Sequence, residues 1–191
     1  MSDSSNGTSS SSSSSSPGDL QRVQDVTSLL MNDESWPNSQ DWTSPLLPHL
    51  HLLSATSQQP HPRAVWRFTV QPIHCNRFGN LHGGCTSTLF DFCTSVVLVL
   101  VASSSKSTTT GIGMDSNWGS FGVSRTLNTT YLRPAPAGTE LLVECEIVQL
   151  GKRLCQLRGT LRRASDGSVL ATCEHGKVNS DPPSSSSSSK L

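Results

Sequence analysis

A histidine followed by two glycines, with an aspartate eight residues after the first glycine, is the part of this sequence best suited to chemistry. His82, Gly83 and Gly84 lead into an apolar stretch that carries Asp91. Glycines at a helix start leave backbone N–H groups unobstructed, so these groups and the positive end of the helix dipole can stabilise charge on a carbonyl oxygen. A carboxylate in apolar surroundings is costly unless a site or partner solvates it. The pattern therefore predicts either a reactive site or a capped helix with one polar residue facing a solvent channel.

The elements that must position these residues follow from the hydrophobic periodicity. A long apolar segment at residues 85–102 favours a helix buried nearly all round, although its valines would also suit a buried strand. Alternating or β-branched segments predict five strands, at residues 64–73, 122–132, 140–150, 154–163 and 169–178. The order predicts one strand, one helix and a four-stranded antiparallel meander, with the helix covering the apolar face of the sheet.

The rest of the chain divides by composition. Residues 1–19 and 180–191 contain serine runs that cannot offset chain entropy, so we expect disordered tails there. Residues 20–62 form an N-terminal arm, with a short helix at 20–31 and then irregular chain. Residues 63–179 are expected to form the one compact domain. Within it, residues 103–120 form a polar insert with a lone Trp118, which predicts a surface loop.

Composition also excludes several classes of function. The formal net charge is +0 and no basic block is present, which argues against nucleic acid as a partner. The 6 cysteines include no Cys-x-x-Cys pair, so we expect no metal site and reduced thiols in an intracellular protein. The N-terminus is polar rather than basic and apolar, so we expect no signal peptide. The apolar run at residues 89–102 is too short for a membrane span.

The sequence resembles the hotdog-fold acyl-CoA thioesterases of the phenylacetate-type and thioesterase-superfamily-member-2-like (acyl-coenzyme A thioesterase 13-like) group. The resemblance covers residues 65–179 and depends on several motifs in the same order. They are Asn76…Gly79-Asn80-Leu81-His82-Gly83-Gly84…Thr88-Leu89-Phe90-Asp91, then Gly122-Val123-Ser124…Leu127-Asn128…Tyr131-Leu132…Pro134, then Gly151-Lys152. It implies an α+β hotdog fold, an antiparallel sheet wrapped around one long central helix. It also implies a homodimer or homotetramer with active sites between subunits, and no cofactor.

The resemblance implies a role for each residue of the catalytic set. Asp91 would be the general base or nucleophile of thioester hydrolysis, and Ser124 would position the attacking water. Asn76 and the Gly83 N–H would hold the thioester oxygen, while His82 would orient Asn76. Structural alternatives stay open: His82 as a turn cap, Ser124 as an ordinary strand serine and Asn76 as a turn residue.

A second set would bind coenzyme A, by family position. It comprises Tyr131, Arg133, Pro134, Gly151, Lys152, Arg153 and His175. The three cationic side chains of this set are suited to phosphates, although a solvated polar face would have the same composition. The insert at residues 103–120 is longer than compact family members carry, which leaves substrate preference and tetramer arrangement open.

Three other functions fit parts of the sequence. A non-catalytic acyl-CoA-binding or regulatory hotdog protein would bind coenzyme A without hydrolysis. A hotdog hydratase would need a histidine at a spacing from the acid that is absent from this sequence. A pure interaction module would depend on Trp36 and Trp42 of the N-terminal arm.

The sequence ends in Ser189-Lys190-Leu191 after a serine run. A free Ser-Lys-Leu tripeptide is an address that the peroxisomal import receptor binds. We therefore expect a peroxisomal location, with cytosol or mitochondrion as the alternatives.

Overall fold

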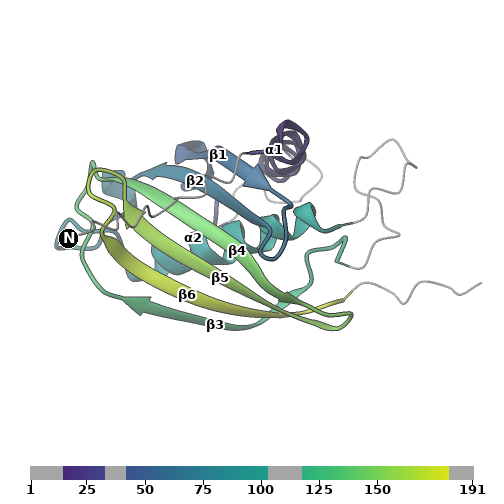
Figure 1. Cartoon of the computed structure of the whole chain (residues 1–191). Coiled ribbons are helices and arrows are strands. Elements are labelled where there is room, and N and C mark those ends of the chain that lie inside the picture. The colour runs from purple at the N-terminus through teal and green to yellow at the C-terminus, as the bar shows by residue number, and fades with distance from the viewer. Residues whose placement is uncertain (1–14, 33–41, 103–117, 181–191) are drawn as a thin grey trace, which may run out of the picture.

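A six-stranded antiparallel sheet wrapped around one long helix is the main feature of the computed structural model, which describes residues 15–32, 42–102 and 118–180. The concave face of the sheet holds the central helix, and a second helix lies beside one edge (Figure 1). The predicted α+β hotdog architecture is confirmed. The two serine-rich tails, Trp36, the Ser-Lys-Leu tripeptide and most of the polar insert lie outside the described residues.

The elements follow one another in a simple order along the chain. The helices are α1 (Pro17–Asn32) and α2 (Gly83–Val96), with three short 3-10 turns, η1 (Leu47–His49), η2 (Pro72–His74) and η3 (Val97–Leu100). The strands are β1 (Leu50–Thr56), β2 (Arg63–Thr69), β3 (Val123–Tyr131), β4 (Glu140–Leu150), β5 (Leu154–Arg163) and β6 (Val169–Val178). The last three strands have the predicted boundaries, because their alternation and their Gly or Asp-Gly turns are clear in the sequence.

The order of strands in the sheet differs from the predicted meander. The sheet runs β1-β2-β4-β5-β6-β3, so β3 pairs with β6 and forms an edge. Only β4, β5 and β6 form a meander. β4 pairs on its other side with β2, which takes the place that we expected β3 to have. Every residue of β3 is at least partly exposed, in contrast to the alternating burial of β4 and β5.

The core lies between the concave face of the sheet and α2. Inward residues of β4, such as Leu141 and Val143, are fully buried, as are Leu89 and Phe90 of α2. Gly159 of β5 lets Phe90 approach, since a Cβ atom there would lie 2.5 Å from the Phe90 ring. The helix is therefore seated on the sheet by the residue that precedes Asp91.

Chain that we expected to be irregular is ordered at the N-terminal side of the domain. Residues 50–56 form β1, which pairs with β2, and α1 packs against β1 and η3. Arg22 of α1 donates hydrogen bonds to the carbonyl oxygens of Val99 (2.6 Å) and Ala102 (2.9 Å) at the end of the helical segment. This pairing satisfies carbonyl groups that a helix end leaves without partners.

Two further expectations were wrong in detail. β2 ends at Thr69, and residues up to Ile73 belong to a turn and η2 rather than to the strand. Trp118 does not lie in a surface loop: its side chain is fully buried, and its Nε1–H donates to the carbonyl of Gly151 at 2.8 Å. Burial of a ring this large contributes more free energy to folding than desolvation of the polar residues around it costs.

The central helical segment meets the length and composition of a membrane span. It runs from Gly83 to Leu100 through α2 and η3, and 56% of it is buried inside the fold. A helix in the core of a globular domain can have the same length and composition, and this segment lies inside the sheet.

Candidate active site

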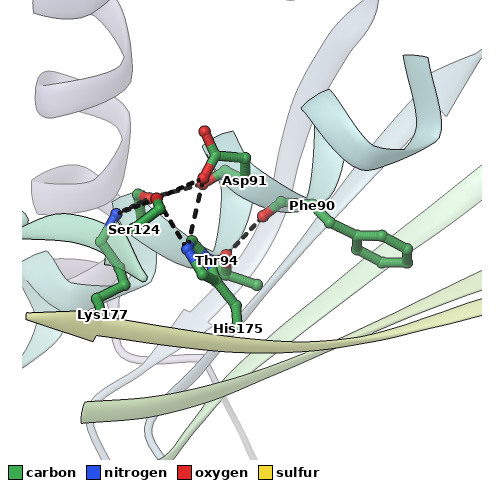
Figure 2. A network of polar contacts seen from close by, with 7 residues as sticks. Phe90, Asp91, Thr94, Ser124, His175 and Lys177 are labelled. Carbon is green, nitrogen blue, oxygen red and sulfur yellow. Dashed lines mark hydrogen bonds and ion pairs between the residues drawn. The ribbon is translucent and has the colours of Figure 1, made fainter. Parts of the chain in front are cut away.

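Asp91 lies at the centre of a network of polar side chains contributed by α2, β3 and β6 (Figure 2). The Ser124 hydroxyl donates to Asp91 Oδ1 at 2.9 Å, and His175 Nε2 lies 3.0 Å from Ser124 Oγ and 3.4 Å from the same carboxylate oxygen. The Asp91 side chain is 50% exposed, whereas His175 is fully buried beneath it. The carboxylate thus faces solvent on one side and the Ser124 and His175 side chains on the other.

The ring orientation of His175 is set by Thr94, one turn after Phe90 on α2. Thr94 Oγ1 donates to the Phe90 carbonyl at 2.5 Å, so it can only accept from His175 Nδ1, which lies 2.6 Å away. A neutral His175 therefore carries its proton on Nδ1 and presents an unprotonated Nε2 to Ser124 and Asp91.

Burial keeps His175 neutral. Burial and, to a smaller extent, the nearby Lys177 charge lower the pKa of His175, the Asp91 carboxylate opposes them, and the net result is a pKa of about 4. With His175 neutral, the single proton of Ser124 can satisfy Asp91 or Nε2 but not both. One of these two acceptors is therefore left without a proton and can accept one.

Lys177 completes the floor of the network. Its side chain is only 4% exposed, and its Nζ donates to Ser95 Oγ at 2.6 Å and to Ser124 Oγ at 3.4 Å. Ser95 in turn donates to the backbone carbonyl of Asp91 at 2.6 Å. Burial lowers the pKa of Lys177, and the Asp91 and Cys155 groups oppose that shift.

A second group of predicted residues surrounds the start of α2. His82 is its N-cap, and His82 Nδ1 accepts from the Gly84 N–H at 2.9 Å. Gly83 is the first helical residue, so its N–H has no carbonyl one turn earlier to bind. The capping role that we left open for His82 is therefore present.

Asn76 is a turn residue whose amide nitrogen has no hydrogen-bond partner among the residues that the structure describes. Its Oδ1 accepts from the N–H groups of Phe78 (2.9 Å) and Asn80 (3.3 Å), which fixes the orientation of the amide. The Nδ2 group then points away from these backbone donors and is available to donate. Asn76 and His82 lie in the same loop, but no hydrogen bond joins their side chains within the described residues.

Tyr131 ties the end of β3 to the start of α2. Its hydroxyl donates to the Gly83 carbonyl at 2.9 Å and lies 2.8 Å from Ser87 Oγ. Tyr131 therefore positions the first turn of the helix, even though 54% of it is exposed.

The two groups are separate within one chain. Asp91 follows Gly83 by eight residues, which is about 12 Å at the rise of an α-helix. A carbonyl group that accepts a hydrogen bond from the Gly83 N–H must lie about 3 Å from it. One chain alone therefore does not place Asp91 and Gly83 on the same reacting group.

The predicted coenzyme A residues are likewise divided. Tyr131, Arg133 and Pro134 lie at the C-terminal end of β3, whereas residues 151–153 form the β4–β5 turn near its N-terminal end. The nine residues of β3 span about 27 Å. His175 lies apart from both, in the buried network with Asp91. Arg133 donates to the Val169 carbonyl at 2.7 Å, while Lys152 and Arg153 are exposed.

Sequence reasoning missed three members of the network, Thr94, Ser95 and Lys177. The signals were present: Ser95 is four residues after Asp91, which places it on the same helix face. Lys177 is two residues after His175, so both side chains point to the same face of β6.

Cysteine thiols are poor alternatives as nucleophiles. Burial raises the pKa of Cys85 and of Cys173 to about 12 and that of Cys155 to about 11. A protonated thiol is neither a good nucleophile nor a metal ligand. No cluster of three or more His, Cys, Asp or Glu suited to a metal ion occurs among the residues that the structure describes.

Comparison with known proteins agrees with this architecture. Residues 78–170 match the family model of the thioesterase superfamily. The chain is 29% identical to mouse acyl-coenzyme A thioesterase 13 over 128 residues, which is 67% of this chain and 80% of that protein.

Two solved structures are similar over most of the chain. Zebrafish thioesterase superfamily member 2 is 26% identical, with a TM-score of 0.62 over 82% of this chain and 96% of that one. The mouse thioesterase superfamily member 2 structure is 23% identical, with a TM-score of 0.61 over 83% and 96% of the two chains, and this likeness supports the fold alone.

Proposed function

We propose that this chain, whose residues 78–170 match the thioesterase superfamily, hydrolyses acyl-CoA thioesters with Asp91 as the general base. The observation that carries the proposal is the Ser124 hydroxyl, which donates to Asp91 at 2.9 Å above two buried polar side chains. The curated mouse relative is an acyl-coenzyme A thioesterase, which supports this class of substrate.

The reaction needs a base next to the attacking water. Water is a poor nucleophile at neutral pH, so the half-exposed Asp91 carboxylate takes one of its protons as the oxygen bonds to the thioester carbon. Ser124 holds the carboxylate in place and lies within reach of the same water. The C–S bond then breaks, the carboxylic acid leaves, and the proton passes to the thiolate of coenzyme A.

Donors for the carbonyl oxygen come from the other group. The Gly83 N–H lies at the positive end of α2, and Asn76 Nδ2 is free to donate from the adjacent loop. Because the Gly83 N–H lies about 12 Å from Asp91 along the helix, we propose that the carbonyl oxygen binds to one subunit and the water to Asp91 of a second. The same arrangement would bring the β4–β5 turn of one subunit toward Tyr131 of the other for coenzyme A.

Direct attack by the Asp91 carboxylate is the second chemical route through the same residue. It would form a mixed anhydride that water then opens, with loss of the same thiol. Isotope labelling can identify direct attack: single turnover in ¹⁸O water places the label in the acid product for the base route. Direct attack followed by opening of the anhydride at the Asp91 carbonyl places it in the Asp91 carboxylate instead.

A panel of acyl-CoA thioesters tests the proposed function, with release of free thiol as the measurement. We expect turnover of at least one member, and a fall of about 10²–10⁴-fold in the Asp91→Asn protein. Asp166→Asn makes the same chemical change in the exposed β5–β6 turn and should keep full activity. Binding of coenzyme A without turnover by the unaltered protein would instead support the non-catalytic alternative.

A further inference from the structure

A buried lysine without an ion-pair partner is an expensive feature for a small domain. Lys177 is 4% exposed, and no carboxylate lies within 4.0 Å of its Nζ in the described part of the chain. Within the described residues, its hydrogen-bond acceptors are two hydroxyl groups, Ser95 Oγ and Ser124 Oγ. A desolvated ammonium held in this way costs folding free energy, so its presence needs a reason beyond stability.

Both acceptors lead to the same residue. Ser95 passes a hydrogen bond on to the backbone carbonyl of Asp91, and Ser124 passes one to its carboxylate. Figure 2 places the Lys177 ammonium on the far side of Ser124 from Asp91, so two short paths connect the lysine to the carboxylate. Lys177 itself is set back from the exposed side of Asp91, where a substrate would lie.

The direction of these hydrogen bonds is fixed by the lysine. An ammonium has donors only, so Ser124 Oγ must accept from Lys177 and cannot use its own proton on that side. That proton remains for Asp91 Oδ1 or for the unprotonated Nε2 of His175. The lysine charge also helps to keep His175 neutral and attracts the Asp91 carboxylate.

We propose that Lys177 is a positioning residue for thioester hydrolysis, which orients the Ser124 hydroxyl and the Asp91 main chain from below without touching the substrate. This inference rests on the proposed function of Asp91. The groups around the ammonium are Asp91 and Ser95 from α2, Ser124 from β3, Cys155 from β5 and His175 from β6.

The decisive feature is that stability and activity should change in opposite directions. Lys177→Met keeps the length and the apolar stem but removes the charge, so the melting temperature should stay the same or rise by about 2–4 °C. Turnover with the best acyl-CoA of the panel should fall by up to about 100-fold because the water is no longer aligned. KM should not change, since the lysine makes no contact with substrate.

A spectroscopic signature accompanies the kinetic one. Without the ammonium, the His175 imidazole should take up a proton at higher pH than in the unaltered protein, followed by its ring resonances in NMR. Arg67→Met, which removes an exposed positive charge on β2, controls for net charge and should change neither activity nor the His175 titration.

Ser95→Ala provides a second variant in case Lys177→Met fails to fold. It removes the hydroxyl that links the ammonium to the Asp91 carbonyl and should lower turnover in the same direction, with KM unchanged. Full turnover by either folded variant would overturn the role of Lys177 while leaving the proposed function intact. A drop in melting temperature with unchanged turnover would make Lys177 merely structural. Absence of turnover by the unaltered protein would overturn both.

Discussion

At the scale of single residues, the site depends on which group donates each hydrogen bond. Ser124 gives its only proton to one of two acceptors, and Thr94 forces His175 to expose Nε2. A carboxylate flanked by a fixed neutral imidazole is suited to taking a proton from water and giving it up again.

Removal of the Ser124 hydroxyl should be less harmful than removal of the Asp91 carboxylate. In Ser124→Ala, Asp91 can still accept a proton, but the water and carboxylate are less well aligned, so we expect turnover to fall by about 10–100-fold. Steady-state kinetics beside Asp91→Asn would check the order. A Ser124→Ala protein as inactive as Asp91→Asn would point to Ser124 as a direct participant in bond formation.

Stability should fall in mild acid because of His175. Its pKa is about 4 in the folded protein, below the ordinary value of 6.5, so between those values the unfolded chain binds the proton and the folded chain does not. Unfolding free energy should therefore decrease as the pH drops from about 6.5 to 4, by an amount on the order of 3 kcal/mol. The pKa of His74 is also lowered by burial, and it acts in the same direction.

Urea unfolding at pH 7 and pH 4.5 measures this effect. His175→Gln should show a smaller difference between the two pH values than the unaltered protein, whereas His51→Gln, at an exposed position of β1, should show the same difference. An equal pH dependence in His175→Gln would contradict the assignment to His175.

At the scale of elements, the site depends on how α2 is seated. Phe90 packs on Gly159 of β5, and the next residue is Asp91. Tyr131 fixes the helix start and Arg22 binds the carbonyls at its far end. Three contacts from three other elements therefore determine where the carboxylate lies.

Gly159→Ala should disturb this seat. A Cβ atom there would lie 2.5 Å from the Phe90 ring, and overpacking of a core costs about 1–3 kcal/mol. We also expect lower turnover, because a shift of Phe90 moves Asp91 with it. Thermal unfolding and kinetics would check both, with Gly18→Ala in the first turn of α1 as a neutral control. Unchanged stability would mean that Phe90 has room to move aside.

How far the sequence predicted these elements depended on the kind of signal. β4, β5 and β6 have alternating residues and clear turns, so their boundaries were predictable. The position of β3 beside β6 was not, since alternation identifies the face of a strand and not its neighbour. β1 was missed because its leucines and serine have no strong strand preference, and its order comes from pairing with β2.

The candidate site shows the same division. Asp91 and Ser124 were predicted from residue pattern and resemblance, and the structure brings them within hydrogen-bonding distance. Lys177 was missed because a lysine in a strand is ordinarily solvated, and only the tertiary structure buries it. The residues next to Lys177 in the sequence do not reveal which elements bury its side chain.

At the scale of the whole molecule, β3 is an edge that needs a partner. Its outer side has no paired strand in the described chain, and it exposes Val123 and Tyr131. Such an edge invites pairing with another chain. A two-fold axis across β3 would run two strands antiparallel, so the N-terminal end of one β3 would face the C-terminal end of the other. We therefore predict at least a dimer in sedimentation at micromolar concentration, and a monomer there would contradict it.

A shared site can be tested by mixing two inactive proteins. If the carbonyl oxygen binds Asn76 and Gly83 of one subunit and the water binds Asp91 of the other, Asn76→Ala and Asp91→Asn damage different halves of each site. A mixed dimer then contains one site with both defects and one site with none. Refolding the two together in equal amounts should restore about a quarter of the activity of the unaltered protein, because half of the dimers are mixed and each has one good site. Refolding each variant alone is the control and should restore nothing beyond its own residual activity. If the mixture is no more active than the sum of its parts although mass spectrometry detects mixed dimers, Asp91 and Asn76 act within one chain, and the helix must move to bring them together.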